Sequence, residues 1–208
     1  MAGNPNLTRL LEHPAIWRGR TAARRHGLPS GFAALDAYLP DRGWPRSGLI
    51  EILVARFGSG ELRLLLPALS ALTRAATARW CVWVAPPLLP FAPALVAHGM
   101  VLERVAVVGG ARPLWAFEQT LGSGACDAAL AWEARPKLRE LRRLQLAAER
   151  GHALGVLFRP RRAAAQSSVA VLRLGLEPLA AGVRLTLLKG RSARRDTLEL
   201  TWPADGAA

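Results

Sequence analysis

The stretch LPSGFAALDAYLPDRGWPRSGLIEILVARFGSGELRLLL, residues 28–66, decides the fold because its pattern of apolar, turn and glycine residues changes several times over a short distance. Ser30 is placed to cap a short helix, and the apolar residues of that helix recur at helical spacing, at Phe32, Leu35 and Leu39. Turn residues lie between positions 43 and 48, and Leu49–Val54 follows as a strand. A glycine-containing loop at 56–60 then leads directly into a second helix.

Outward from this stretch, strand and helix patterns alternate along the chain. We predict helices at 61–78, 89–98, 113–121 and 138–150, and strands at 80–85, 104–108, 127–132, 153–158, 169–174, 183–189 and 197–202. The last third is richer in strands than in helices. The order predicts an α/β fold with a mostly parallel sheet flanked by helices and an antiparallel C-terminal extension.

The helix at 138–150 has the clearest amphipathic pattern. Its apolar positions predict a buried side, made by Leu138, Leu141, Leu144 and Ala148, while its arginines remain in solvent. Four tryptophans fall on predicted strands or helices, and we expect them to pack in the core rather than to stack on bases: Trp80, Trp83, Trp115 and Trp132.

The length of 208 residues fits one α/β domain with a well-filled core. We expect an N-terminal arm or docking segment at 1–27, the domain itself at 28–202, and a tail at 203–208. The N-terminus resembles neither a signal peptide nor a membrane anchor, since charges and prolines interrupt it. Prolines also break the apolar stretch at 80–96, so we expect a cytoplasmic protein with no membrane partner.

The charge balance is strongly basic. The 28 Lys and Arg residues against 15 Asp and Glu give a net charge of +13, which favours a nucleic acid or an acidic partner protein. Lys137 and Lys189 are the only lysines in the sequence. This arginine bias is open to two interpretations, phosphate recognition or genomic base composition.

Cysteine and histidine usage gives no catalytic or metal site. The two cysteines, Cys81 and Cys126, lie far apart in apolar surroundings, and we expect two buried thiols in a reducing compartment. The four histidines lack metal-pair spacing. We therefore expect no metal.

Residues 31–66 resemble the core of RecA-type ATPases in the order helix, glycine turn, strand, glycine loop, helix. The segments LPSGFAALDAYLP (28–40), GWPRSGLIEIL (43–53) and GELRLLLPAL (60–69) are more specifically similar to ImuA, a RecA- and SulA-like family of accessory proteins in mutagenic translesion DNA synthesis. The segment LPFAPALVAHGMVLERVAVVGG (89–110) and the order of elements up to Arg191 continue the likeness, which covers roughly 28–200.

This resemblance implies a RecA-like domain and a role in the SOS response. It implies contacts with ImuB, an inactive polymerase-like partner, and with RecA itself. The related SulA-like inhibitors of the division GTPase share the fold, and they remain an alternative. An active ATPase or recombinase is a further alternative that requires the motif positions to be misaligned.

The loop departs from a working phosphate-binding loop. Gly58 and Gly60 remain, but the lysine and hydroxyl that bind phosphate and magnesium have become Glu61 and Leu62. By the resemblance, Trp132 stands at the position of the metal-orienting aspartate, and Ala85 stands at that of the water-activating glutamate. We therefore expect a degenerate ATP site, no cofactor and no enzyme activity.

Two basic clusters are candidate contacts for single-stranded DNA. One follows a predicted strand and comprises Arg159, Arg161 and Arg162. By the resemblance, this is the position at which the mobile DNA-binding loop of RecA begins. The other comprises Lys189, Arg191, Arg194 and Arg195. Because both clusters follow strands of a sheet predicted to be largely parallel, we expect them on a common face. The alternative is that they are solvated basic turns in an arginine-rich protein.

Overall fold

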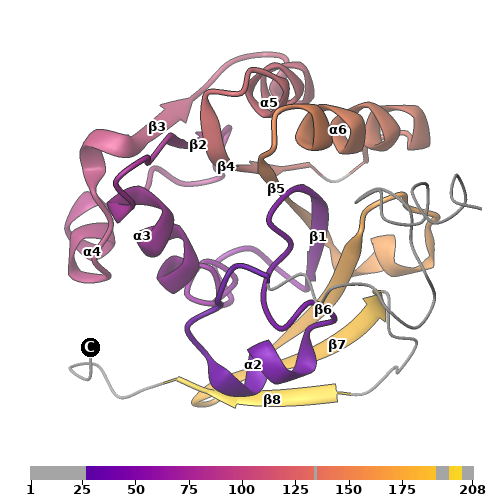
Figure 1. Cartoon of the computed structure of the whole chain (residues 1–208). Helices are drawn as coiled ribbons and strands as arrows, with labels where there is room; N and C mark the ends of the chain where they lie inside the picture. Colours follow the sequence, from indigo (N-terminus) through magenta and orange to yellow (C-terminus); the bar gives the residue numbers. More distant parts are fainter. Residues whose placement is uncertain (1–26, 134, 191–196, 203–208) are drawn as a thin grey trace, which may run out of the picture.

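The computed structural model describes residues 27–133, 135–190 and 197–202. Their eight strands form one sheet in the order β3-β2-β4-β5-β1-β6-β7-β8 (Figure 1). The parallel strands are β1 (Gly48–Val54), β2 (Trp80–Val84), β3 (Val105–Val108), β4 (Cys126–Trp132), β5 (Leu154–Pro160) and β6 (Leu172–Leu179). Two further strands, β7 (Gly182–Lys189) and β8 (Thr197–Thr201), extend the sheet in antiparallel pairing. This confirms the predicted fold class.

Helices cover both faces of the sheet, as parallel strands require. One face packs against α2 (Ala33–Tyr38), α3 (Leu66–Arg74) and α4 (Ala92–Ala97), through residues such as Leu35, Leu69 and Leu95. The other face packs against α5 (Pro113–Gly122) and α6 (Leu138–Arg150), through Phe117 and Leu141. Short 3-10 turns, η1 (Leu102–Arg104) and η2 (Arg161–Ala165), precede β3 and follow β5. Every residue of β1 is buried, so β1 is the centre of the core.

The helix expected at 61–78 is shorter than predicted. Residues 61–65 form turns, and α3 begins at Leu66. Pro67 thereby lies in the first helical turn, where its missing N–H breaks no helical hydrogen bond. The short helix before β1 also differs, because its N-cap residue is Phe32 and Ser30 instead bonds Phe32 and Asp36 in the preceding turn.

The strand predicted at 169–174 lies further along the chain, at 172–179. Residues 169–171 lead into it, and the Val171 N–H donates to the Leu49 carbonyl of β1. Leu172, Leu174 and Leu176 alternate along this strand, and their side chains face the core. The strand therefore continues as far as the tight turn before Gly182, where β7 begins.

Two expectations about packing are wrong in part. Leu138, the first residue of α6, is 39% exposed, whereas Leu141, Leu144 and Ala148 further along the helix are buried. Trp83 and Trp132 are core residues as predicted. Trp80 and Trp115 lie at the start of a strand and on the outer side of a helix, and both remain exposed.

These packing differences predict a graded response to substitution in α6. Leu141→Asp places a charge in the apolar layer between α6 and the sheet, and we expect it to lower the free energy of unfolding by about 3 kcal/mol or more. Arg142→Ala and Leu138→Asp change exposed positions and should shift it by less than about 1 kcal/mol. Urea denaturation of the three variants measures this, and equal losses for Leu141→Asp and Leu138→Asp would contradict the packing.

Candidate functional site

The loop that joins β1 to α3 is closed by its own side chain. The Glu61 carboxylate is 3% exposed and turns back onto the loop. Its Oε1 accepts a hydrogen bond of 2.7 Å from the Gly58 N–H, and its Oε2 accepts one of 2.7 Å from the Ser59 N–H. Successive backbone N–H groups of this kind form a concave anion site. Glu61 therefore does more than repel a phosphate, because it takes the N–H groups that a phosphate would use.

The same loop is covered from outside by Trp202, the residue that follows the last strand. Gly60 has φ of +94°, and a Cβ atom added to it would lie 2.9 Å from Cζ2 of Trp202. The Arg63 guanidinium lies over the Trp202 ring at 5.2 Å from its centroid, and the Phe32 ring lies 6.0 Å away. Only glycine fits beneath the indole. Leu62 packs against the core and presents no oxygen to a metal ion.

The carboxyl end of β4 carries an aromatic group where the resemblance places a metal-orienting carboxylate. The Trp132 ring stacks on Phe158 with centroids 4.9 Å apart, and it contacts Trp83 at 6.0 Å. Trp132 is buried at this position. Ala85 follows β2 with φ of +47°, and it too offers no acid–base group. Apolar packing thus occupies the sheet edge beside the loop.

Arg159 is not a surface cation, which corrects its assignment as a DNA contact. Its side chain is fully buried. Nη1 donates to Glu51 Oε1 at 3.0 Å, and Nη2 donates to Gln166 Oε1 at 2.6 Å. The position after a predicted strand suggested a loop residue. In the structure Arg159 is still inside β5, and its side chain faces the buried carboxylate of β1.

Arg173 completes the buried cluster around Glu51. Its Nε donates to Glu51 Oε2 at 2.6 Å, and its Nη2 donates to the Ala163 carbonyl of η2 at 2.7 Å. Ser168 Oγ donates a third bond to Glu51, at 3.0 Å. The cluster ties the η2 connection to the sheet. This connection is therefore short and anchored, unlike the mobile loop that the resemblance led us to expect.

The remaining members of the basic clusters have mixed environments. Arg161 and Arg162 are exposed on η2, and Arg161 forms an ion pair with Glu177 of β6. Lys189 is exposed at the end of β7, and its Nζ donates to the Ser168 carbonyl at 2.8 Å. Arg191, Arg194 and Arg195 lie outside the described residues.

The prediction that both basic clusters lie on a common face is wrong for Lys189. η2 follows the carboxyl end of the parallel strand β5, but β7 runs antiparallel to β6. Lys189, at the end of β7, pairs with Arg173 and therefore lies near the amino ends of the parallel strands. Its bond to the Ser168 carbonyl links it to the connection between β5 and β6.

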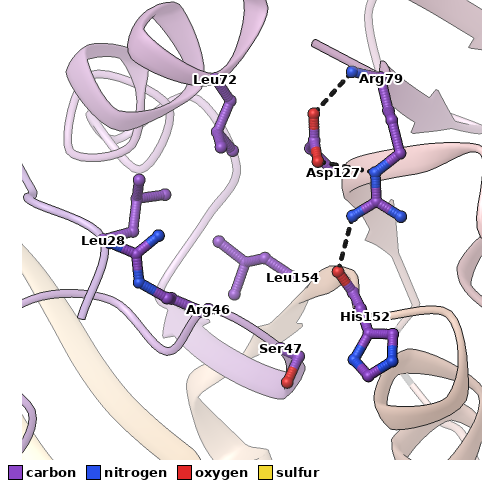
Figure 2. Close-up of a pocket in the computed structure, with 8 residues that line it drawn as sticks. All are labelled: Leu28, Arg46, Ser47, Leu72, Arg79, Asp127, His152 and Leu154. Atoms are coloured by element: carbon purple, nitrogen blue, oxygen red, sulfur yellow. Dashed lines mark hydrogen bonds and ion pairs between the residues drawn. The ribbon is translucent and has the colours of Figure 1, made fainter. Parts of the chain in front are cut away.

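A pocket of about 250 Å³ lies at the opposite edge of the sheet from the closed loop, near the amino ends of β1, β4 and β5 (Figure 2). Its lining residues are Leu28, Arg46, Ser47, Leu72, Arg79, Asp127, His152 and Leu154. Arg79 donates to Asp127 and to the carbonyls of Gly124, Gly151 and His152. Most N–H groups of the Arg79 side chain thus hydrogen-bond to neighbouring turns, so this residue has a structural role. No sequence motif pointed to this cluster.

The cysteines are buried, as expected. Burial raises the pKa of Cys81 to about 12 and that of Cys126 to about 11, so both thiols are protonated at neutral pH and are poor nucleophiles. Among the described residues, no group of three or more His, Cys, Asp and Glu side chains is arranged to hold a metal ion. No helix of the described chain is long and apolar enough to span a bilayer.

Fold and loop together define a class of protein: an α/β domain in which the glycine loop after the first strand is closed by an internal carboxylate. No protein-family model matches the chain. The chain is 31% identical over 117 residues to the cell division inhibitor SulA of Photorhabdus laumondii subsp. laumondii, a match that covers 55% of this chain. It spans 65% of the length of that relative. The crystal structure of SulA from Pseudomonas aeruginosa aligns with a TM-score of 0.45 and 24% identity, over 53% of this chain and 97% of that one.

Because the loop N–H groups bind the Glu61 carboxylate, we expect that a free anion can bind there when this carboxylate is removed. Glu61→Ala leaves the Gly58 and Ser59 N–H groups without an acceptor, and we expect it to cost about 1–3 kcal/mol of stability. Inorganic phosphate or sulfate should then raise the melting temperature of this variant but not that of the native protein. Glu103→Ala removes an exposed carboxylate and serves as the control. Equal stabilisation of all three proteins by phosphate would contradict the assignment.

Proposed function

We propose that this protein is a non-catalytic accessory protein of the SOS response that acts through contacts with other proteins. The observation that carries the proposal is the Glu61 carboxylate bound to the Gly58 and Ser59 N–H groups. A loop that supplies its own anion has no free donors for a nucleotide phosphate. The apolar packing of Trp132 and the cover provided by Trp202 support the same conclusion.

The similarity to SulA supports an SOS-associated role without enzyme activity. Within that role, the resemblance of residues 28–69 to ImuA favours an accessory of translesion synthesis that contacts ImuB and RecA. A SulA-like inhibitor that acts on the division GTPase is the alternative, and the match to a cell division inhibitor favours it. We propose a cytoplasmic location for either role.

Two measurements test this function. Calorimetric titration with ATP and magnesium should give no heat of binding, and micromolar affinity would refute the degenerate site. Co-purification against ImuB, RecA and the division GTPase then separates the two roles. Retention of ImuB or RecA supports the translesion role, and retention of the division GTPase alone supports the alternative. Failure of all three rejects the proposal.

Direct binding of single-stranded DNA is a second candidate function. It is supported by the net charge of +13 and by the exposed Arg161, Arg162 and Lys189. Arg191, Arg194 and Arg195 add charge in the sequence. Arg159 is excluded from this candidate, since its side chain is buried against Glu51.

We expect this binding to be weak and sensitive to salt, because each neutralised phosphate releases counterions. Arg161→Ala/Arg162→Ala should reduce the affinity for a labelled oligonucleotide and flatten its salt dependence. Arg139→Ala/Arg142→Ala removes the same charge from the exposed side of α6 and controls for net charge. Fluorescence anisotropy at low salt measures both. Equal losses in the two double variants would show that net charge alone acts.

A further inference from the structure

The connection from β2 into α4 presents apolar side chains to solvent. Its sequence is PPLLPFAPALVA, residues 86–97. Leu89 is 85% exposed and Phe91 is 71% exposed, and Leu88 and Val96 are exposed beside them. Within α4 only Leu95 is buried. We call Leu88, Leu89, Phe91 and Val96 the α4 surface.

The α4 surface differs from an ordinary exposed segment in composition and in stiffness. Residues 80–102 contain no Asp, Glu, Lys or Arg, in a chain of which 21% is charged. Four prolines in this segment, at positions 86, 87, 90 and 93, fix the backbone φ angle. A stiff segment loses little conformational entropy on binding. Adjacent exposed apolar side chains are typical of interaction surfaces.

Arginines border the α4 surface. A Cβ atom added to Gly99, just after α4, would lie 3.1 Å from Arg74 Nη1, and Arg104 belongs to η1, which contacts α4. Both arginines are exposed. Glu103 is the exposed acid among them, so the border is positive.

We infer that the α4 surface binds a segment of a partner protein in which apolar side chains are flanked by Asp or Glu. The inference rests on the proposed function, since it specifies how the protein contacts others. Apolar side chains would cover Leu89 and Phe91, and the acidic flanks would pair with the bordering arginines.

Charge also decides against other occupants. A second copy of this chain would bring its own arginine border against the first, which is repulsive. A membrane-surface helix carries Lys or Arg along its polar side, but α4 has six residues and none of them is charged. An acidic, apolar protein segment fits both features of the surface.

The test selects peptides from a random phage-displayed library on the native protein and measures their affinities by fluorescence anisotropy. We expect enriched peptides to combine Leu, Ile or Phe with flanking Asp or Glu. Leu89→Ser/Phe91→Ser should weaken their binding by about tenfold or more, since aromatic anchors dominate such interfaces. Arg74→Glu/Arg104→Glu should weaken it too, as should added salt. Leu146→Ser, a similarly exposed leucine on α6, should change nothing.

Several results would overturn the inference: no enrichment, peptides of basic character, or equal binding to the Leu89→Ser/Phe91→Ser variant. Concentration-dependent dimerisation of the native protein, lost in that variant, would assign the surface to a second copy. Binding to phosphatidylserine vesicles, lost in the same variant, would assign it to lipid. Both substituted side chains are exposed, so the melting temperature should change little. If peptides behave as expected but ImuB, RecA and the division GTPase all fail to co-purify, only the proposed function is rejected.

Discussion

The architecture depends on one buried carboxylate, Glu51, in the middle of the central strand β1. A charge in that place is costly unless it is paired and hydrogen-bonded. Arg159 from β5 and Arg173 from β6 supply the pairing from the two strands that flank β1. The cluster forms only when these three strands are in register. It thus favours one arrangement of the sheet, and it fixes the η2 connection by the same bonds.

The closed loop uses similar chemistry at the carboxyl end of β1. There an acidic side chain again satisfies donors of its own chain, this time the backbone N–H groups of Gly58 and Ser59. Trp202 then covers Gly60, so the last strand is packed against the loop that follows the first. This loop, which by sequence resembles a nucleotide site, is thus packed between Glu61 and Trp202. What remains available for interaction is the outside: the α4 surface and the exposed arginines.

Sequence patterns predicted the sheet well because strand and helix periods are local properties. The position of Pro67 within its helix was harder to predict. It depends on the residue at which the helix begins, and the turn at 61–65 determines that residue. Arg159 was assigned to the surface since nothing near it in the sequence reveals Glu51, which is distant in the chain. The direction of β7 and the exposure of Leu138 are likewise tertiary properties. The sequence predicted that Glu61 does not fit a phosphate loop, whereas the two hydrogen bonds that the loop donates to it required coordinates.

The packing around Gly60 has a consequence for how substitutions in the loop combine. Replacing Glu61 by lysine would not by itself create a phosphate site, because Leu62 would still lack a hydroxyl, Trp132 would still stack on Phe158, and Trp202 would still cover the glycine. The same replacement would remove the acceptor of the Gly58 and Ser59 N–H groups. The effect of a change at position 61 therefore depends on the residues at positions 62, 132 and 202, which is epistasis built into the packing of the loop.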